Sequence, residues 1–252
     1  MSLLKGLLGF FACFLVFQQV WAAEDSRIDD RVLVDPTVMP WRAIGRVNRQ
    51  TVGGHCTGVL ISPDTVLTAA HCVWNPRTRK RMPVQSMHFL AGYKGGEWIA
   101  HSRASSLFVA PGYKPRYKGN SSTDRTARDW AVMRLEKPIG AKIGWFSVLP
   151  FDREYLKTFK KEGHSIIQAG YSGDKPHALS VDRDCSLDKI IKRWQLLRHS
   201  CHVKGGDSGS PIFTRQGDGY GLVGIHVGSR VEKGKRVGFA VTAKTILDGL
   251  AE

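Results

Sequence analysis

Acidic residues are scarce in this sequence, which has 22 Asp and Glu against 37 Lys and Arg and a formal net charge of +15. Such a balance favours anionic partners, among them nucleic acid, anionic polymers and acidic surfaces. The basic residues are nevertheless scattered, and the one dense run, Arg77-Thr78-Arg79-Lys80-Arg81, contains no aromatic residue. We interpret that run as a solvated loop and expect no specific nucleic-acid partner.

Long hydrophobic runs are missing after the first segment of the chain, so we expect no membrane span there. The first segment has Lys5, an apolar run from Leu7 to Val16, and then Ala22 and Ala23. This pattern is typical of a secretory signal peptide. The apolar run is too short for a confident membrane span, and an uncleaved anchor is the alternative. We expect a signal peptide over residues 1–22, a secreted or periplasmic protein, and no membrane contact after cleavage.

Cysteine occurs five times, and no two cysteines have the close CxxC spacing of structural zinc sites. Cys13 leaves with the signal peptide, and the even set of Cys56, Cys72, Cys185 and Cys201 indicates two disulfides in an exported chain. The sequence permits three pairings. Local pairing, 56 with 72 and 185 with 201, is the economical choice, with each bridge contributing about 3 kcal/mol.

Short apolar or alternating runs, separated by Gly, Pro, Asp and Asn, dominate the rest of the chain. Many short strands at such spacing indicate an all-β sandwich or barrel rather than βαβ units. Ala243–Leu250 is expected to form a short terminal helix, and Asp188–Leu197 a helix or an irregular loop. The strands are expected around Val59–Ile61, Thr65–Thr68, Ala131–Leu135, Ser165–Gly170, Pro211–Phe213 and Gly221–Val227.

A serine flanked by glycines is the first candidate for chemistry. Ser208 stands in Gly205-Gly206-Asp207-Ser208-Gly209-Ser210-Pro211, directly before a predicted strand. Glycines let the backbone turn tightly and approach a ligand closely. The amides of Gly206 and Ser208 can then point at one oxyanion. Gly-Ser turns are common, so an ordinary surface turn is the alternative, and the strand that follows argues against it.

A serine alcohol needs an imidazole to take its proton and a carboxylate to orient that imidazole. His71 follows a predicted strand and two alanines, whose small side chains leave room for an imidazole in a cleft. Asp129 precedes the apolar run Trp-Ala-Val, so a buried strand would carry its carboxylate inward; Asp124, in a polar loop, is the poorer alternative. A division near residues 140–148 separates these residues from Ser208 and predicts a site between two halves.

The segments around His71, Asp129 and Ser208 resemble those of the trypsin-like (chymotrypsin-fold) serine endopeptidases, whose chain order is also His, Asp, Ser. The resemblance implies that these three residues form a catalytic triad. It also implies that the amides of Gly206 and Ser208 form the oxyanion hole and that the Cys56–Cys72 bridge lies beside the catalytic histidine.

The same resemblance implies an all-β fold of two antiparallel six-stranded barrels, about residues 32–142 and 143–252, with the active site in the cleft between them. Peptide or protein substrates and hydrolysis through an acyl-enzyme are implied, with no metal and no organic cofactor, and we expect a monomer. Ser210, together with Gly224-Ile225-His226, is similar to the bacterial glutamyl-endopeptidase-like branch.

The segment before the domain resembles a zymogen leader. Residues 23–31 are acidic and end in Arg31, before the aliphatic residues Val32 and Leu33. We expect cleavage after Arg31, which would free the α-amino group of Val32 to pair with Asp207. Because breaking a buried pair of this kind costs about 3–5 kcal/mol, processing would be coupled to the oxyanion hole.

Two histidines bear on specificity. His202 stands six residues before Ser208, where trypsins that cut after Lys or Arg have an aspartate, so a basic P1 residue is not expected. His226 matches the histidine that glutamyl-specific relatives use against a substrate carboxylate. Both imidazoles suit an acidic P1 residue, because a desolvated carboxylate needs charge-assisted donors. The alternative is that both are neutral wall residues of an apolar pocket.

A second class of function is a catalytically silent, trypsin-like protein that binds anionic polymers through its basic surface. All three triad residues stand in their motifs, which favours the enzyme. An esterase or lipase would show the α/β-hydrolase residue order and βαβ alternation, and neither pattern occurs here.

Overall fold

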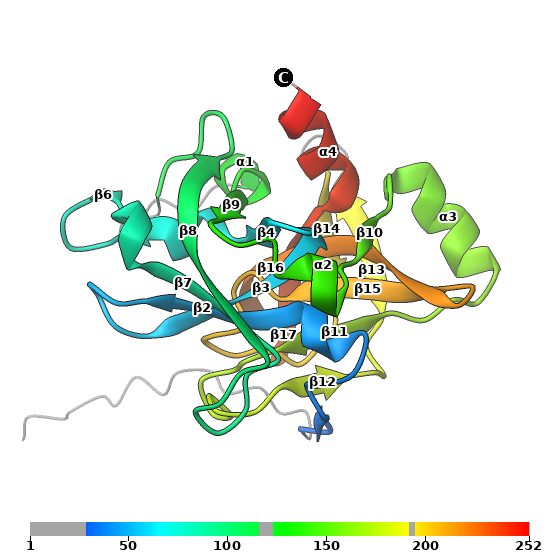
Figure 1. The fold of residues 1–252 in the computed structure, drawn as a ribbon. Coiled ribbons are helices and arrows are strands. Elements are labelled where there is room, and N and C mark those ends of the chain that lie inside the picture. Colours follow the sequence, from blue (N-terminus) through cyan, green and yellow to red (C-terminus); the bar gives the residue numbers. More distant parts are fainter. Residues whose placement is uncertain (1–28, 116–122, 192–194, 252) are drawn as a thin grey trace, which may run out of the picture.

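The fold is taken from a computed structural model that describes residues 29–115, 123–191 and 195–251 (Figure 1). The expected signal peptide and residues 23–28 of the expected leader lie outside these ranges. Within them, every helix is too short or too polar to cross a membrane.

Six antiparallel strands close a barrel in the first half of the chain, as the resemblance implied (Figure 1). Closing the sheet leaves no unpaired edge, and inward-facing side chains such as Val47, Val59 and Met133 fill the interior. The strands follow in the order β2 (Ile44–Arg49), β3 (His55–Ser62), β4 (Thr65–Thr68), β9 (Ala131–Leu135), β8 (Ala100–Val109) and β7 (Met87–Ala91).

The second half forms a nine-stranded sheet, so the expected second six-stranded barrel is not confirmed. Its end strands, β1 and β13, do not pair with each other within the described residues, and β10 adds to β16 in parallel. The path runs through β1 (Val32–Leu33), β12 (Ser180–Asp182), β11 (Ile167–Gly170), β15 (Pro211–Gln216), β16 (Gly219–Glu232), β17 (Lys235–Thr242), β14 (Leu196–His199) and β13 (Leu187–Ile191), with β10 (Ser147–Val148) beside it.

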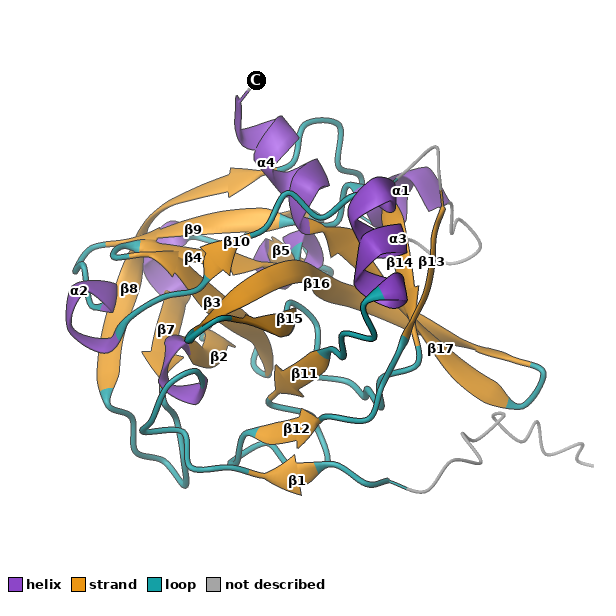
Figure 2. Ribbon diagram, turned by 90° about the vertical axis from the view of Figure 1, so that its right-hand side faces the viewer, coloured by secondary structure: helices purple, strands orange, loops and turns teal. Residues whose placement is uncertain are grey.

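Strand β1 belongs to the second sheet, although the sequence placed residue 32 at the start of the first half. Val32 pairs with Val181 and Leu33 with Ser180, and Figure 2 shows β1, β12 and β11 side by side. The amino-terminal segment therefore crosses to the second half before the first barrel begins.

The helices are few and short. The terminal helix α4 (Ala243–Ala251) confirms the expectation from the sequence. Helix α3 (Arg153–Lys161) was not anticipated; its N-cap Asp152 accepts hydrogen bonds from the amides of Glu154 and Tyr155, a common helix-start signal. The remaining elements are η1 (Trp41–Ala43), η2 (Ala70–Val73), η3 (Val84–Ser86), α1 (Thr123–Ala127), α2 (Gly140–Ile143), β5 (Trp74–Asn75) and β6 (Lys80–Arg81).

The helix or loop expected over Asp188–Leu197 is wrong, because most of this segment belongs to the antiparallel strands β13 and β14. A register shift between Leu187 and Ile190 places both of these residues on the buried side, three positions apart. A bulge of this kind disrupts the two-residue alternation of a strand, and the resulting spacing imitates a helix.

One hydrophobic core joins the two halves. Trp41 and Phe146, which flank the first barrel, both pack edge-on against Phe213 of β15, with ring centroids 6.0 and 4.9 Å apart. All three side chains are buried. These aromatic contacts therefore pack the two halves against each other.

Candidate active site

His71 and Asp129 are brought together by two neighbouring strands. Strand β4 leads into η2, which holds His71, and Asp129 lies two residues before β9; Thr68 pairs with Ala131 across these strands. Asp129 is buried, and its Oδ2 lies 2.8 Å from His71 Nδ1 while its Oδ1 accepts the His71 backbone N–H at 2.9 Å. A carboxylate only accepts hydrogen bonds, so Nδ1 carries the ring proton of neutral His71 and Nε2 is left as the base.

Ser208 is held against the first barrel by Thr57 of β3. The Thr57 backbone N–H donates to Ser208 O at 2.9 Å, and Thr57 Oγ1 donates to Gly206 O at 3.0 Å. Thr57 Oγ1 also accepts the amide of Tyr171 at 3.0 Å. The nucleophile loop, residues 205–210 around the candidate nucleophile Ser208, comes from the second half. One buried threonine of the first barrel therefore contacts it through two hydrogen bonds.

Gly206 and Gly209 occupy conformations that other residues rarely adopt, with φ of 95° and 81°. A Cβ on Gly206 would lie 2.5 Å from Tyr171 O, and a Cβ on Gly209 would lie 2.3 Å from Thr57 O. The glycines that the sequence singled out are therefore required by both backbone conformation and space.

His71, Asp129 and Ser208 line a single cavity of about 360 Å³. The cavity thus brings together residues from both halves of the chain, and their catalytic roles stay a prediction. The other residues around the cavity are Arg49, Trp74, Pro76, Tyr113, Pro115 and Val227.

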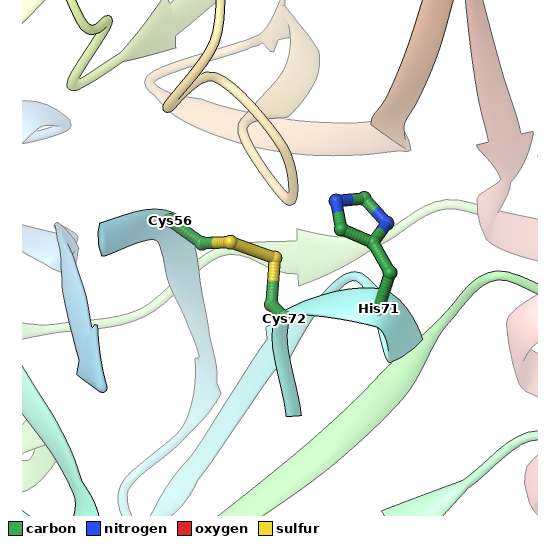
Figure 3. A group of neighbouring side chains, drawn as sticks. All are labelled: Cys56, His71 and Cys72. Carbon is green, nitrogen blue, oxygen red and sulfur yellow. A yellow bond between two sulfur atoms is a disulfide. The ribbon is translucent and has the colours of Figure 1, made fainter. Parts of the chain in front are cut away.

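Both local disulfides are present, Cys56–Cys72 and Cys185–Cys201. Figure 3 shows the first of them beside His71, which precedes Cys72 in η2. Among the residues that the structure describes, two groups of side chains have metal-ligand spacing, Cys56 with His71 and Cys72, and Asp182 with Cys185 and Cys201. Each group contains a bonded cysteine pair, so no thiolate is available for zinc in the oxidised protein.

The histidines named for specificity lie in different surroundings. His226 is buried on β16, and its backbone is tied to the nucleophile loop, accepting from Gly209 N–H at 2.7 Å and donating to Ser210 O at 2.9 Å. Its ring Nδ1 lies 3.0 Å from Nε2 of His199, a residue of β14 that the sequence did not single out. His202 is also buried, and its backbone N–H donates to Asp182 at 2.7 Å.

The residues named for activation are also close together, in a chain whose Arg31–Val32 bond is intact. Arg31 Nη1 lies 3.8 Å from Asp207 Oδ2, and both side chains are almost fully buried. Val32 is 47% exposed within β1. The contact to Asp207 is therefore made by the arginine side chain, and cleavage after Arg31 stays a prediction.

Stability is expected to fall as pH rises from about 4 to about 7 because of Asp207. Burial raises the pKa of this carboxyl to about 7, against the lowering effects of the Lys204 backbone N–H and the Arg31 guanidinium. An unfolded Asp has a pKa of about 3.9, so between these values the folded state binds more protons and loses a few kcal/mol as pH rises. Urea unfolding at several pH values, compared between the wild type and Asp207→Asn, isolates this contribution from that of the histidines.

The acidic neighbours of Asp207, Asp29 and Asp174, affect stability in a different pH range. A hydrogen bond from Arg31 lowers the pKa of Asp29. The pKa of Asp174 is also lowered. Burial alone would raise it, but hydrogen bonds from Ser172, Lys204 and Arg31 outweigh that effect. These two carboxylates contribute stability that is lost only below pH about 4. An Asp207→Asn variant that keeps the full decline between pH 4 and 7 would contradict the assignment.

Known proteins support the fold and the family. A family model described as Trypsin matches residues 33–249. A glutamyl endopeptidase of Bacillus licheniformis is 28% identical over 187 residues, 73% of this chain and 53% of that protein. Serine protease 23 of Rattus norvegicus is 30% identical over 173 residues, 64% of this chain and 43% of that protein.

A solved structure of a Glu endopeptidase in complex with MPD has a TM-score of 0.64 and 21% identity, covering 88% of this chain and 97% of that one. The chain spans about half the length of the curated relatives it matches. The resemblance to the glutamyl-endopeptidase branch noted in the sequence is thus found again in sequence and in fold. Because the family model covers most of the chain, this protein belongs to the trypsin family.

Proposed function

We propose that the protein is an exported serine endopeptidase that hydrolyses peptide bonds through an acyl-enzyme. The observation that supports this most directly is the shared cavity of Ser208, His71 and Asp129, in which Asp129 bonds both the ring and the backbone of His71. The peptidase acts on peptides or proteins and needs no cofactor for this reaction.

In the first step, Ser208 Oγ attacks the scissile carbonyl carbon while His71 Nε2 takes the hydroxyl proton. The negative charge on the carbonyl oxygen is stabilised by the amides of Gly206 and Ser208. As the carbon–nitrogen bond breaks, His71 returns the proton to the amine and the acyl group stays on Ser208. A water molecule, activated by the same imidazole, then hydrolyses the ester and restores the serine hydroxyl.

We propose further that the preferred P1 residue is acidic, with His226 as the donor to its carboxylate. The backbone N–H of Cys201 donates to His199 Nδ1 at 3.2 Å, so neutral His199 carries its proton on Nε2. That nitrogen donates to His226 Nδ1 at 3.0 Å, which places the proton of neutral His226 on Nε2. His226 directly precedes Val227, which lines the cavity, and proton binding by the histidine pair would add positive charge beside it.

Arg49 adds a positive charge to the same cavity. Its side chain lines the cavity with His71 and Ser208, and burial lowers its pKa. No carboxylate pairs with Arg49 within the described part of the chain. A guanidinium without a partner in a substrate cleft suits acidic side chains near the scissile bond.

The peptidase proposal is tested by labelling the exported protein with a fluorophosphonate and by profiling its cleavage of a peptide library. We expect one labelled residue, Ser208, and cleavage mainly after Glu or Asp. Absence of label together with binding to an anionic polymer would favour the catalytically silent binding protein. Labelling with cleavage after apolar residues would retain the peptidase and reject the acidic preference.

Gly238→Ala is expected to weaken the acidic preference without affecting the triad. A Cβ at Gly238 would lie 2.1 Å from His199 Cε1 and 2.3 Å from His199 Nε2, so the ring must move away from His226. Because a hydrogen bond to a charged group contributes about 1.5–3 kcal/mol, kcat/KM for Glu substrates is expected to fall roughly 10- to 100-fold. Gly219→Ala is the control, since its Cβ would meet no atom closer than 3.7 Å. Equal kcat/KM values for the two variants would exclude the His199–His226 pair from specificity.

A further inference from the structure

Arg31 has a buried guanidinium that makes several hydrogen bonds near the loop that contains Ser208. Its side chain is 0% exposed. Nη2 bonds Asp29 and Asp174 at 2.7 Å each, Nε bonds Asp29 at 2.8 Å, and Nη1 donates to Ser172 Oγ at 2.7 Å. These bonds fix the guanidinium to the folded domain, which a segment that is simply removed would not require.

Two partners of Arg31 come from a segment about 140 residues further along the chain. Ser172 and Asp174 follow β11, and Ser172 Oγ in turn donates to Asp174 at 2.7 Å. Asp174 also pairs with Lys204 at 2.9 Å, three residues before Asp207. Three basic and three acidic residues form this network: Arg31, Lys175, Lys204, Asp29, Asp174 and Asp207.

Asp207 needs a counter-charge, because it is 1% exposed and a buried carboxylate is costly unless it is paired. Its Oδ2 accepts the Lys204 backbone N–H at 2.8 Å, which closes the turn that contains Gly205 and Gly206. The cation near this oxygen is Arg31, at 3.8 Å.

The position of Asp207 controls the oxyanion hole, because Asp207 lies between the two proposed amide donors. Its backbone N–H bonds Lys204 O at 3.2 Å, and its own carbonyl accepts the Ser210 amide at 2.9 Å. A rotation of the Asp207 side chain out of its buried place would disturb the two adjoining peptide planes, which carry the Gly206 carbonyl and the Ser208 amide.

We propose that Arg31 is a positioning residue of the peptidase: its guanidinium, brought in by the segment before Val32, holds Asp207 in place and so keeps the oxyanion hole formed. This inference rests on the proposed peptidase function. It reverses the expectation drawn from the sequence, since the active form retains Arg31 and cleavage after it removes activity. In the intact chain, the Arg31 side chain supplies the positive charge near Asp207 that the freed α-amino group of Val32 was expected to supply.

The first test compares Arg31→Gln and Arg31→Lys in the full chain, with Arg42→Gln as the matched control. Arg42 comes from the same region and donates to Ile143 O at 2.6 Å, away from Asp207. For Arg31→Gln we expect kcat to fall about 100-fold, the size of effect seen when one oxyanion donor is lost, with KM changed by less than about threefold. Arg31→Lys is expected to recover most of the activity, and Arg42→Gln to keep it.

The second test separates this role from cleavage, because Arg31→Gln would also block processing after a basic residue. Wild-type protein is labelled with a fluorophosphonate, and the amino terminus of the labelled molecules is determined by mass spectrometry. Labelled molecules that contain Arg31 support the inference. Labelled molecules that all begin at Val32, or full activity of Arg31→Gln, overturn it while the peptidase proposal stands.

A third measurement tests the contact between Arg31 and Asp207 without relying on activity, so its failure is distinguishable from failure of the peptidase proposal. In the wild type, the decline in stability caused by Asp207 is expected to end near pH 7. Without the Arg31 charge, the Asp207 carboxyl holds its proton to higher pH, so the decline is expected to continue by at least one pH unit in Arg31→Gln. Arg31→Lys and Arg42→Gln should match the wild type, and an unchanged end point in Arg31→Gln refutes the contact.

Discussion

Replacing Ser208 by alanine is expected to lower kcat for peptide hydrolysis about a million-fold, because loss of the nucleophile removes the whole acylation path. The side chain is only half-buried, and the contacts that hold the residue use its backbone carbonyl and its neighbours. The fold should therefore survive, and the thermal unfolding midpoint should stay close to that of the wild type. Steady-state hydrolysis of a Glu peptide, together with fluorophosphonate labelling, measures the loss.

Ser210→Ala is the matched control for this variant. Ser210 lies in the same glycine-rich loop, but its hydroxyl accepts a hydrogen bond from Gln168 Nε2 at 2.8 Å inside the protein. We expect this variant to be labelled as the wild type is. Retained activity in Ser208→Ala, or transfer of the label to another residue, would mean that the nucleophile has been assigned wrongly.

Asp129→Asn should reduce kcat about 10⁴-fold while leaving the backbone in place. The carboxylate accepts a hydrogen bond from His71 Nδ1–H. It thereby keeps the ring in the tautomer whose unprotonated Nε2 can act as the base. An amide nitrogen at that position donates instead, so Nδ1 loses its proton and Nε2 gains it. The variant is compared with the wild type by kcat measured from pH 6 to pH 9.

Asp64→Asn provides the same chemical change at a surface position. Asp64 pairs with Arg134 at 2.7 Å, and both side chains are substantially exposed, so little effect on kcat is expected. If Asp129→Asn were to keep kcat within tenfold of the wild type, the carboxylate would have no part in orienting His71.

The three residues that we propose as the triad stand out in the sequence because each lies in a short segment that has its own signature. The glycines around Ser208 are needed for backbone conformation and space, and His71 and Asp129 stand at the ends of apolar strands that pair. The first barrel, the local disulfides and the terminal helix followed from the same local patterns and from the resemblance.

The roles of His199, Arg31 and Thr57 could not be anticipated in this way. The bulge in β13 lies in the segment Asp188–Leu197, just before His199, for which the sequence predicted a helix or an irregular loop. Arg31 before two aliphatic residues resembles a cleavage site, and its partner Asp174 lies 143 residues away in the sequence. No sequence motif marks Thr57, because its role comes only from its hydrogen bonds to the nucleophile loop of the other half. Contacts between distant segments depend on packing, which no local pattern records.

Thr57 has a consequence for how the enzyme could be switched off. Its single hydroxyl bonds both the Gly206 carbonyl and the Tyr171 amide, so separating the two halves would disturb the nucleophile loop. We therefore expect catalytic turnover to depend on the contact between the halves. A molecule that separates them should inhibit the enzyme without binding in the substrate cleft.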